Sequence, residues 1–307
     1  MQKKTIGKII TKKVNEWLST IEDKALAASV ESHILISGGC IASMFLDQPV
    51  NDFDVYLTDK KVLYKLAEYY ASPLKIRVLD GEKREEILQH YIEQSGTKFT
   101  NIENNISELA VRYRNLKPDQ IKLDVSSAGH RMELMDEQKD SAKYLPVFFS
   151  QNAISLTDNL QIVLRFSGTA EQIHENFDFI HATNYWTKKD GVVTNLEAME
   201  SIVSKELKYQ GSLYPLTSII WIKKFIKKGW TINAGEMLKI MFQISDLNLK
   251  DVLTLEEQLI GVDVAYFFTL INVLRGMDVK TITSHSLNTI IDRVFNQHDD
   301  TDDHSAE

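Results

Sequence analysis

Hydrophobic and polar residues alternate along the first part of the chain in patterns that predict helices and strands in turn. Apolar residues recur at helical spacing from Ile6 to Ile21 and predict an N-terminal helix over residues 5–30. The run "HILIS" predicts a short buried strand, and "GGCIASMFL" predicts a turn that leads into a helix. Apolar residues alternate with polar ones, as in a strand, in "NDFDVYL", and they recur at helical spacing in "KKVLYKLAEYYAS".

The middle of the chain contains shorter patterns, most of them typical of strands. Strand candidates are "LKIRVL", "QIKLDVSS", "NAISL" and "LQIVLRF", and "TAEQIHENF" predicts a short helix. Residues 80–120 are polar and are compatible with a helical insertion around "ISELAVRYRNL". "FDFIHATNYWT" predicts another strand, and the "KKDG" that follows it predicts a turn.

Beyond about residue 195 the spacing becomes helical, as in "NLEAMESIVSKELKYQ", "PLTSIIWIKKFIKKGW", "AGEMLKIMFQIS" and "TLEEQLIGVDVAYFFTLINVLRG". Strands in the first part and helices in the second predict an α+β domain with a mixed sheet and flanking helices, followed by an α-helical C-terminal domain. The expected boundaries are an N-terminal helix over 1–30, an α+β domain over 31–195 with an insertion around 80–150, a helical domain over 196–296 and a disordered acidic tail over 297–307.

The composition is that of a globular protein, because 43% of the 307 residues are hydrophobic and 25% are charged. The sequence has no run of about 18 apolar residues, so we expect no membrane span. A single cysteine, Cys40, excludes an internal disulfide and favours a reducing, cytoplasmic location. The net charge of −8 argues against a protein that coats nucleic acid through a broadly basic surface, but it is compatible with a local basic groove.

An acidic pair stands out in the strand "NDFDVYL". Side chains alternate between the two faces of a strand, so Asp52, Asp54 and Tyr56 are expected on one face and Phe53 and Val55 on the other. Two carboxylates about 7 Å apart on one face repel each other unless a cation lies between them. Mg²⁺ is the cation that this pattern favours, since it prefers oxygen ligands and often bridges to substrate phosphates.

The glycine pair that precedes this strand supplies a complementary feature. A turn at Gly38 and Gly39 lets backbone amides approach an anion closely, and the helix that follows adds the positive end of its dipole. Ser43, one turn further into that helix, could add a hydroxyl group. A phosphate cradle beside a metal-binding acid pair predicts a site for a nucleoside triphosphate.

In this combination, "SGGCIASMFL" followed by "NDFDVYL", the chain resembles the DNA polymerase β-like nucleotidyltransferase superfamily, which includes tRNA CCA-adding enzymes and bacterial poly(A) polymerases. The resemblance covers residues 33–60 well and the rest loosely. Ala42 and Ser43 stand where an Arg-Asp pair is usual in the CCA-adding enzymes, which argues against CCA addition itself.

The resemblance implies a third carboxylate on a neighbouring strand. Asp178 in "NFDFIHATNYW" and Asp124 in "IKLDVSS" both lie between apolar residues, and Asp178 is preferred because "DFIHATN" is similar to the "DFTINA" strand of the CCA-adding group. A strand there would place Asp178, Ile180, Ala182 and Asn184 on one face, so Asn184 is a candidate for cofactor binding. For either acid the alternative is a residue at a strand edge with no metal.

The resemblance further implies two Mg²⁺ ions that Asp52 and Asp54 hold together, with Asp178 helping the ion that activates the attacking hydroxyl. The expected activity is transfer of a nucleoside monophosphate from an NTP, with release of pyrophosphate, to an acceptor hydroxyl. The acceptor could be an RNA 3′ end such as that of tRNA, a small molecule or a protein side chain. No membrane partner is expected.

Other features have weaker interpretations. The lysines of "WIKKFIKKGW" are either a solvated helix face or, through Lys224 in particular, a contact to phosphate or RNA. His174 and His181 match no zinc pattern and are expected to be structural. Two alternatives to nucleotidyl transfer remain: a glycosyltransferase that binds a sugar nucleotide through Asp52 and Asp54, and an inactive nucleotidyltransferase-like scaffold that binds a partner.

Overall fold

The computed structural model describes residues 1–84, 86, 113, 116–126, 129–132, 143–249, 251, 254–255, 258 and 288–289. The chain divides into two compact units, Met1–Gln210 and Gly211–Glu307. This boundary lies later than the expected one at residue 195, because helix α9 (Leu196–Ser204) packs against the short helix η3 (Ile180–Ala182) within the first unit.

An eight-stranded mixed sheet forms the centre of the first unit, in the order β10-β9-β1-β2-β8-β7-β6-β5. The strands in that order are Gly191–Val193, Tyr185–Thr187, Ile34–Ser37, Phe53–Leu57, Leu160–Ser167, Ala153–Leu156, Pro146–Phe149 and His130–Arg131. All neighbours in this sheet are antiparallel except β2 and β8, which are parallel. The predicted α+β class with a mixed sheet is therefore confirmed.

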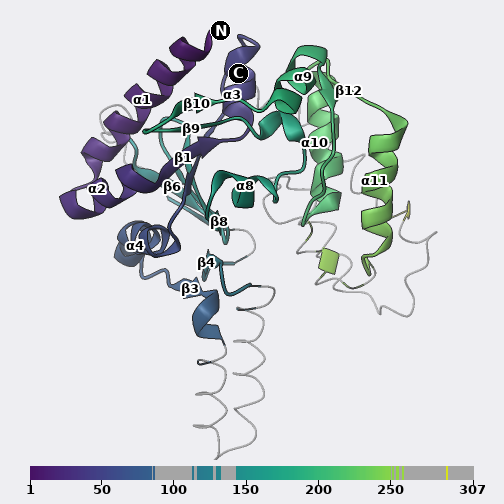
Figure 1. Cartoon of the computed structure of the whole chain (residues 1–307). Coiled ribbons are helices and arrows are strands. Elements are labelled where there is room, and N and C mark those ends of the chain that lie inside the picture. Colours follow the sequence, from purple (N-terminus) through teal and green to yellow (C-terminus); the bar gives the residue numbers. More distant parts are fainter. Residues whose placement is uncertain are drawn as a thin grey trace, which may run out of the picture. The chain divides into compact units, whose positions relative to one another are not determined.

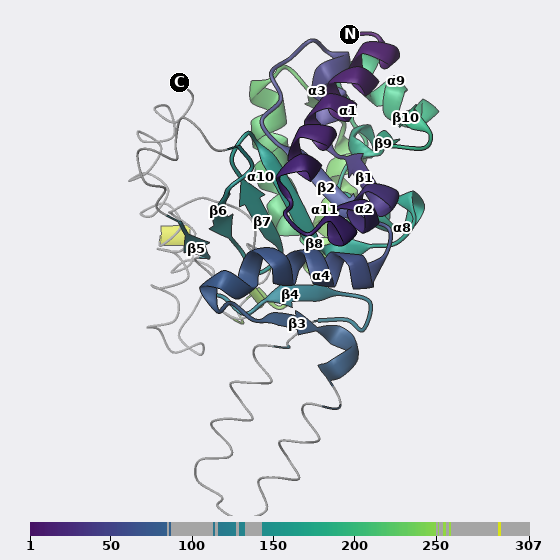
Figure 2. The same ribbon diagram turned by 90° about the vertical axis from the view of Figure 1, so that its left-hand side faces the viewer.

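Three helices cover one face of this sheet: α1 (Lys3–Thr20), α2 (Lys24–His33) and α4 (Lys60–Ala71). Figures 1 and 2 show all three on the same side of the strands. Their apolar faces pack on the inward residues of the strands in one continuous core, in which Trp17 of α1 and Leu66 of α4 have no exposed surface. Trp17 donates a hydrogen bond from Nε1 to the Tyr70 hydroxyl at 3.0 Å, which ties α1 to α4.

The opposite face carries a smaller apolar cluster under helix α8 (Ala170–His174). Ile173 and Phe177 pack there on Leu35 of β1 and Tyr56 of β2, and the Tyr56 and Phe177 ring centroids are 5.6 Å apart. Helix α3 (Gly39–Phe45) follows β1, as the sequence predicted. Asp54, which alternates with core residues Phe53 and Val55, lies on this second face.

Strands β3 (Val78–Asp80) and β4 (Ile121–Leu123) form a separate two-stranded sheet, and Ile121 and Leu123 belong to the same core as the main sheet. Short helices η1 (Ser72–Leu74) and η2 (Gly81–Lys83) flank β3, and β11 (Glu206–Leu207) follows α9. The strands predicted in "LKIRVL" and "QIKLDVSS" are thus confirmed in part. The predicted helix in "ISELAVRYRNL" and the acidic tail lie outside the described residues.

The single N-terminal helix predicted over residues 5–30 is wrong, because residues 21–23 are not helical and separate α1 from α2. Asp23 begins the second helix by accepting hydrogen bonds from the amides of Ala25 and Leu26, at 2.9 and 3.0 Å. An aspartate at this position satisfies amides that a new helix leaves unpaired, so it stabilises a helix start in the middle of a continuous apolar pattern.

In the second unit the described residues include α10 (Pro215–Lys227), β12 (Thr231–Ile232) and α11 (Ala234–Ser245). Both helices were predicted, whereas most of "TLEEQLIGVDVAYFFTLINVLRG" lies outside the described residues.

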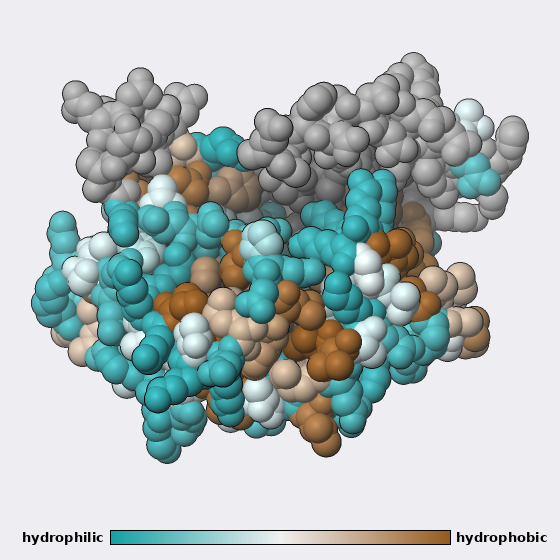
Figure 3. All heavy atoms as spheres, turned by 90° about the horizontal axis from the view of Figure 1, so that it is seen from above, coloured by the Kyte–Doolittle hydropathy of each residue, from teal (hydrophilic) through white to brown (hydrophobic). Residues whose placement is uncertain are grey.

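The surface drawn in Figure 3 is mainly hydrophilic with hydrophobic patches between. Strongly exposed apolar side chains include Phe242 of α11, at 71%, and Val203 of α9, at 80%. Among the described residues, none of the helices has the length and hydropathy that crossing a bilayer requires.

Candidate functional site

The glycine turn and the acidic strand meet in the structure. Gly38 has φ +93° and ψ −160°, a conformation that side chains rarely permit. A Cβ atom on Gly38 would lie 2.7 Å from Oδ2 of Asp54, which is closer than two such atoms can approach. The contact arises because β1 and β2 are antiparallel and Ser37 is paired with Asp54. The predicted proximity of the turn and the acidic strand is confirmed.

The two aspartates of the strand are electrostatically coupled. Asp52 is exposed and immediately precedes β2, while Asp54 is half-buried within it. Burial raises the pKa of Asp54 to about 7, and the negative charge of Asp52 adds to the increase. Burial also raises the pKa of Asp52 above its usual value. Both carboxylates are therefore less stable in their charged form than in water, and a cation beside them would relieve this cost.

A hydrogen-bond network connects the turn to residues between His174 and Asn184. The Ser37 hydroxyl, which has no exposed surface, donates to the Asn184 carbonyl at 2.9 Å and lies 2.9 Å from Nε2 of His174. Burial lowers the pKa of His174 to about 4, so the ring is neutral and can donate Nε2–H to Ser37. The amide of Gly38 donates to the Ala182 carbonyl at 3.1 Å. The expected structural role of His174 agrees with these contacts.

Gln161 of β8 lies where the resemblance led us to expect an acid on the neighbouring strand. It pairs in register with Asp54 across the parallel β2–β8 ladder, so both side chains are on the same face. Its Nε2 donates to the hydroxyl of Ser155 on β7 at 3.3 Å. The alternation in "LQIVLRF" predicted the strand, but only the pairing of β2 with β8 identifies Gln161 as a neighbour of Asp54.

The strand predicted in "FDFIHATNYWT" is confirmed at its end, as β9, but is wrong around Asp178. Asp178 lies in a bend between buried Phe177 and Phe179, and the following residues form η3 instead of a strand. Phe179 forms an isolated bridge with Tyr209 and is not part of a strand, so the alternation of apolar residues reflects a bend that buries two rings.

No third acid joins the pair in the described part of the chain. No group of three His, Cys, Asp or Glu side chains is placed there to hold a metal ion. Asp178 therefore does not form a three-carboxylate group with Asp52 and Asp54. Asp124, the alternative, follows β4 in the other sheet, and its carboxylate lies 3.9 Å from Nε of Arg77.

The remaining predicted binding residues have different environments. Asn184 has no exposed surface, and its Oδ1 accepts a hydrogen bond from the Asn195 amide at 2.9 Å, which favours a structural role over a nucleotide contact. Gly39 begins α3, and a Cβ atom there would meet nothing within 4 Å. Ser43 is half-buried in the same helix. Lys224 belongs to the second unit, where its ammonium group lies 4.6 Å from the centre of the Trp221 ring.

Two solved structures are similar to this chain. One is the CCA-adding enzyme of Thermotoga maritima complexed with tRNA, at 11% identity and a TM-score of 0.38, with 96% of this chain and 62% of that chain covered. The other is the CCA-adding enzyme of Bacillus stearothermophilus in complex with CTP, at 10% identity and a TM-score of 0.30, with 78% and 47% covered. The chain thus spans less than two thirds of the length of either structure.

No curated protein matches the sequence. The family model described as Gad2, Gabija anti-defense 2 family protein, matches residues 8–205, which include the glycine turn, the acidic strand and β8. Since this match covers more than half of the chain, the protein belongs to the Gabija anti-defense 2 family.

Proposed function

We propose that the protein is a metal-dependent nucleotidyltransferase, which moves a nucleoside monophosphate from an NTP to an acceptor hydroxyl and releases pyrophosphate. The observation that carries this proposal is the contact between Gly38 and Asp54, because it brings a backbone turn suited to phosphate within reach of a paired carboxylate. A strand acid without this neighbour would support only a cation site.

The donor set fits Mg²⁺. Asp52 and Asp54 offer carboxylate oxygens, and burial raises the pKa of each, with no cationic side chain of the described residues offsetting the rise. These two residues would hold the ion, which when bound would neutralise triphosphate charge and lower the pKa of the acceptor hydroxyl.

The chain's own groups would position the nucleotide. The Gly38 amide is already used by the Ala182 carbonyl, so the amides that open α3, beginning with Gly39, are the ones that would bind phosphate oxygens. Ser37 and His174 keep the turn against Asp54 through buried hydrogen bonds. The side-chain amide of Gln161 is an uncharged polar neighbour of Asp54. A carboxylate at that position would add to the repulsion that Asp54 already experiences from Asp52.

The family description suggests the biological setting. We propose that transfer of the nucleotide serves the anti-defense role against Gabija that the family's name describes. An RNA end, a protein side chain and a small molecule all provide the hydroxyl that the chemistry needs, so the acceptor is best identified by experiment.

The test is incubation of the purified protein with each α-labelled NTP, in the presence and absence of Mg²⁺, together with total RNA and protein from a cell extract. We expect Mg²⁺-dependent transfer of label to one class of acceptor. The variant Asp52→Asn/Asp54→Asn should lose transfer, because it removes both carboxylates and preserves their shape.

The matched control is Asp119→Asn/Asp158→Asn, which removes two exposed carboxylates of the same unit. It should transfer label as the wild type does. Equal transfer by the Asp52/Asp54 variant, or label incorporated only from a sugar nucleotide, would refute nucleotidyl transfer at this site.

A further inference from the structure

A groove of about 990 Å³ lies in the first unit between α1 and the β9–β10 hairpin. Trp186 and Val192 belong to its lining and are almost completely buried, at 2% and 4% exposed. These residues pack on the face of the sheet that α1 covers, whereas Asp54 lies on the other face. The groove is therefore a separate feature from the nucleotide site.

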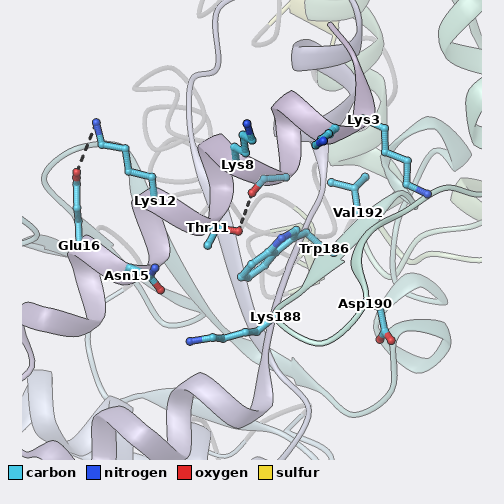
Figure 4. Close-up of a pocket in the computed structure, with 13 residues that line it drawn as sticks. Lys3, Lys8, Thr11, Lys12, Asn15, Glu16, Trp186, Lys188, Asp190 and Val192 are labelled. Atoms are coloured by element: carbon cyan, nitrogen blue, oxygen red, sulfur yellow. Dashed lines mark hydrogen bonds and ion pairs between the residues drawn. The ribbon is translucent and has the colours of Figure 1, made fainter.

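The lining is strongly basic in a protein whose net charge is −8. Its lysines are Lys3, Lys4, Lys8, Lys12 and Lys188. Its acidic residues are Glu16 and Asp190, so the lining has a net positive charge. Two of the lysines have acidic partners: Lys12 lies 3.9 Å from Glu16, and Lys188 forms an ion pair with Glu31. Figure 4 shows lysines on α1 and Lys188 on the opposite side of Trp186.

The other three lysines are not used by the fold. The side chains of Lys3, Lys4 and Lys8 are exposed and make no hydrogen bond or ion pair in the described part of the chain. Lys13 of the same helix provides the contrast, since its ammonium group lies 4.8 Å from the centre of the Phe53 ring and burial lowers its pKa. Helix α1 thus presents the half-buried Lys13 to the Phe53 ring, whereas Lys3, Lys4 and Lys8 line the groove without an acidic partner among the described residues.

The row of groove-lining lysines on α1, which includes the paired Lys12, has a spacing that suits a polymer with regularly repeated negative charges. Lys4, Lys8 and Lys12 are four residues apart, so their Cα atoms follow one side of α1 at intervals of about 6 Å. Thr11 and Asn15, which also line the groove, belong to the side-chain types that commonly bind phosphate and sugar oxygens.

We propose that this groove binds the sugar-phosphate backbone of a nucleic acid. The lysine row of α1 and Lys188 contact the phosphates from the two sides, and the neutral polar side chains contact sugar or phosphate oxygens. Since Trp186 is buried, it offers no face on which a base can stack. Binding is therefore indifferent to sequence and strongly dependent on salt.

The test measures fluorescence anisotropy of labelled single-stranded RNA and DNA of mixed sequence with the full chain, between about 50 and 200 mM salt. Lys4→Gln/Lys8→Gln should weaken binding by about tenfold at the lowest salt and reduce the slope of log K against log salt by about 1.4, since each lost phosphate contact contributes about 0.7. The matched control is Lys61→Gln/Lys65→Gln, an exposed pair at the same spacing on α4, which should bind as the wild type does.

Three results would overturn the proposal: no binding by the wild type at the lowest salt, equal weakening in both lysine variants, or competition by polyglutamate as effective as competition by RNA. The last result would indicate an acidic protein partner instead. Asp52→Asn/Asp54→Asn should bind the labelled strands normally, so this test and the test of nucleotidyl transfer succeed or fail independently.

Discussion

Gly38 lies against the Asp54 carboxylate, so that a Cβ atom on Gly38 would be 2.7 Å from Oδ2 of Asp54. The backbone of Gly38 is also in a region that only glycine adopts easily. Steric contact and backbone strain therefore act together at this one position.

Gly38→Ala should lower the free energy of unfolding by about 2 to 4 kcal/mol, because strain and the clash with Asp54 add. Gly191→Ala is the matched control, since Gly191 has φ +65° but open space around its Cβ position. It should cost only about 1 kcal/mol. Urea denaturation of both variants measures the difference, and equal losses would show that Asp54 does not constrain the turn.

Asp54→Asn should stabilise the protein in a pH-dependent way. The pKa of Asp54 is about 7 in the folded protein and about 3.9 when unfolded, so the folded state holds a proton that the unfolded state releases between these values. The contribution of Asp54 to stability therefore falls as pH rises through this window and is least favourable above pH 7.

The free energy of unfolding of the variant should exceed that of the wild type by on the order of 2 kcal/mol at pH 8. This difference should disappear towards pH 4. Chemical denaturation across this pH range measures it. Asp119→Asn, at an exposed position, should show no such gap. A gap that widens at low pH would contradict the raised pKa of Asp54.

Magnesium should raise the thermal stability of the wild type, since an ion bound to the folded state alone stabilises it. At a tenfold excess over Kd the gain is about 1.4 kcal/mol, or a few degrees in Tm. Asp52→Asn/Asp54→Asn should show no gain, whereas Asp119→Asn/Asp158→Asn should respond as the wild type does. A gain that survives loss of both site carboxylates would place the ion elsewhere.

Gln161→Glu should make the site more dependent on metal. The new carboxylate would lie opposite Asp54 on the adjacent strand, and like charges there should cost about 1 kcal/mol at pH 8 without Mg²⁺. Mg²⁺ should recover more stability in this variant than in the wild type. Gln161→Ala, which loses only the hydrogen bond to Ser155, should respond to Mg²⁺ as the wild type does.

Local patterns were sufficient for most elements around the site. The strand of Asp54, the turn at Gly38 and the helix after it were predicted because each depends on neighbours within a few residues. The break at Asp23 was missed because the apolar positions on its two sides continue with helical spacing, although an aspartate before "KALAAS" is itself a helix-start signal.

Long-range pairing explains the remaining errors. "FDFIHATNYW" alternates like a strand, but Phe177 and Phe179 are buried by a bend, and Asp178 is not brought beside Asp54. Gln161 could not be identified from the sequence, since its closeness to Asp54 depends on which strand pairs with β2. The groove along α1 depends likewise on the docking of the β9–β10 hairpin against that helix.

The parallel pairing of β2 with β8 has a consequence for biosynthesis. The two strands are joined through a long connection from Leu57 to Leu160, and closing such a connection is slow compared with forming a hairpin. A nascent chain still on the ribosome can form β1, the glycine turn and β2 early, but it acquires the Gln161 side of the site only after Ser167 has been translated. The acidic strand thus spends an interval of translation with one edge unpaired, and truncated products that end before β8 lack Gln161 beside Asp54.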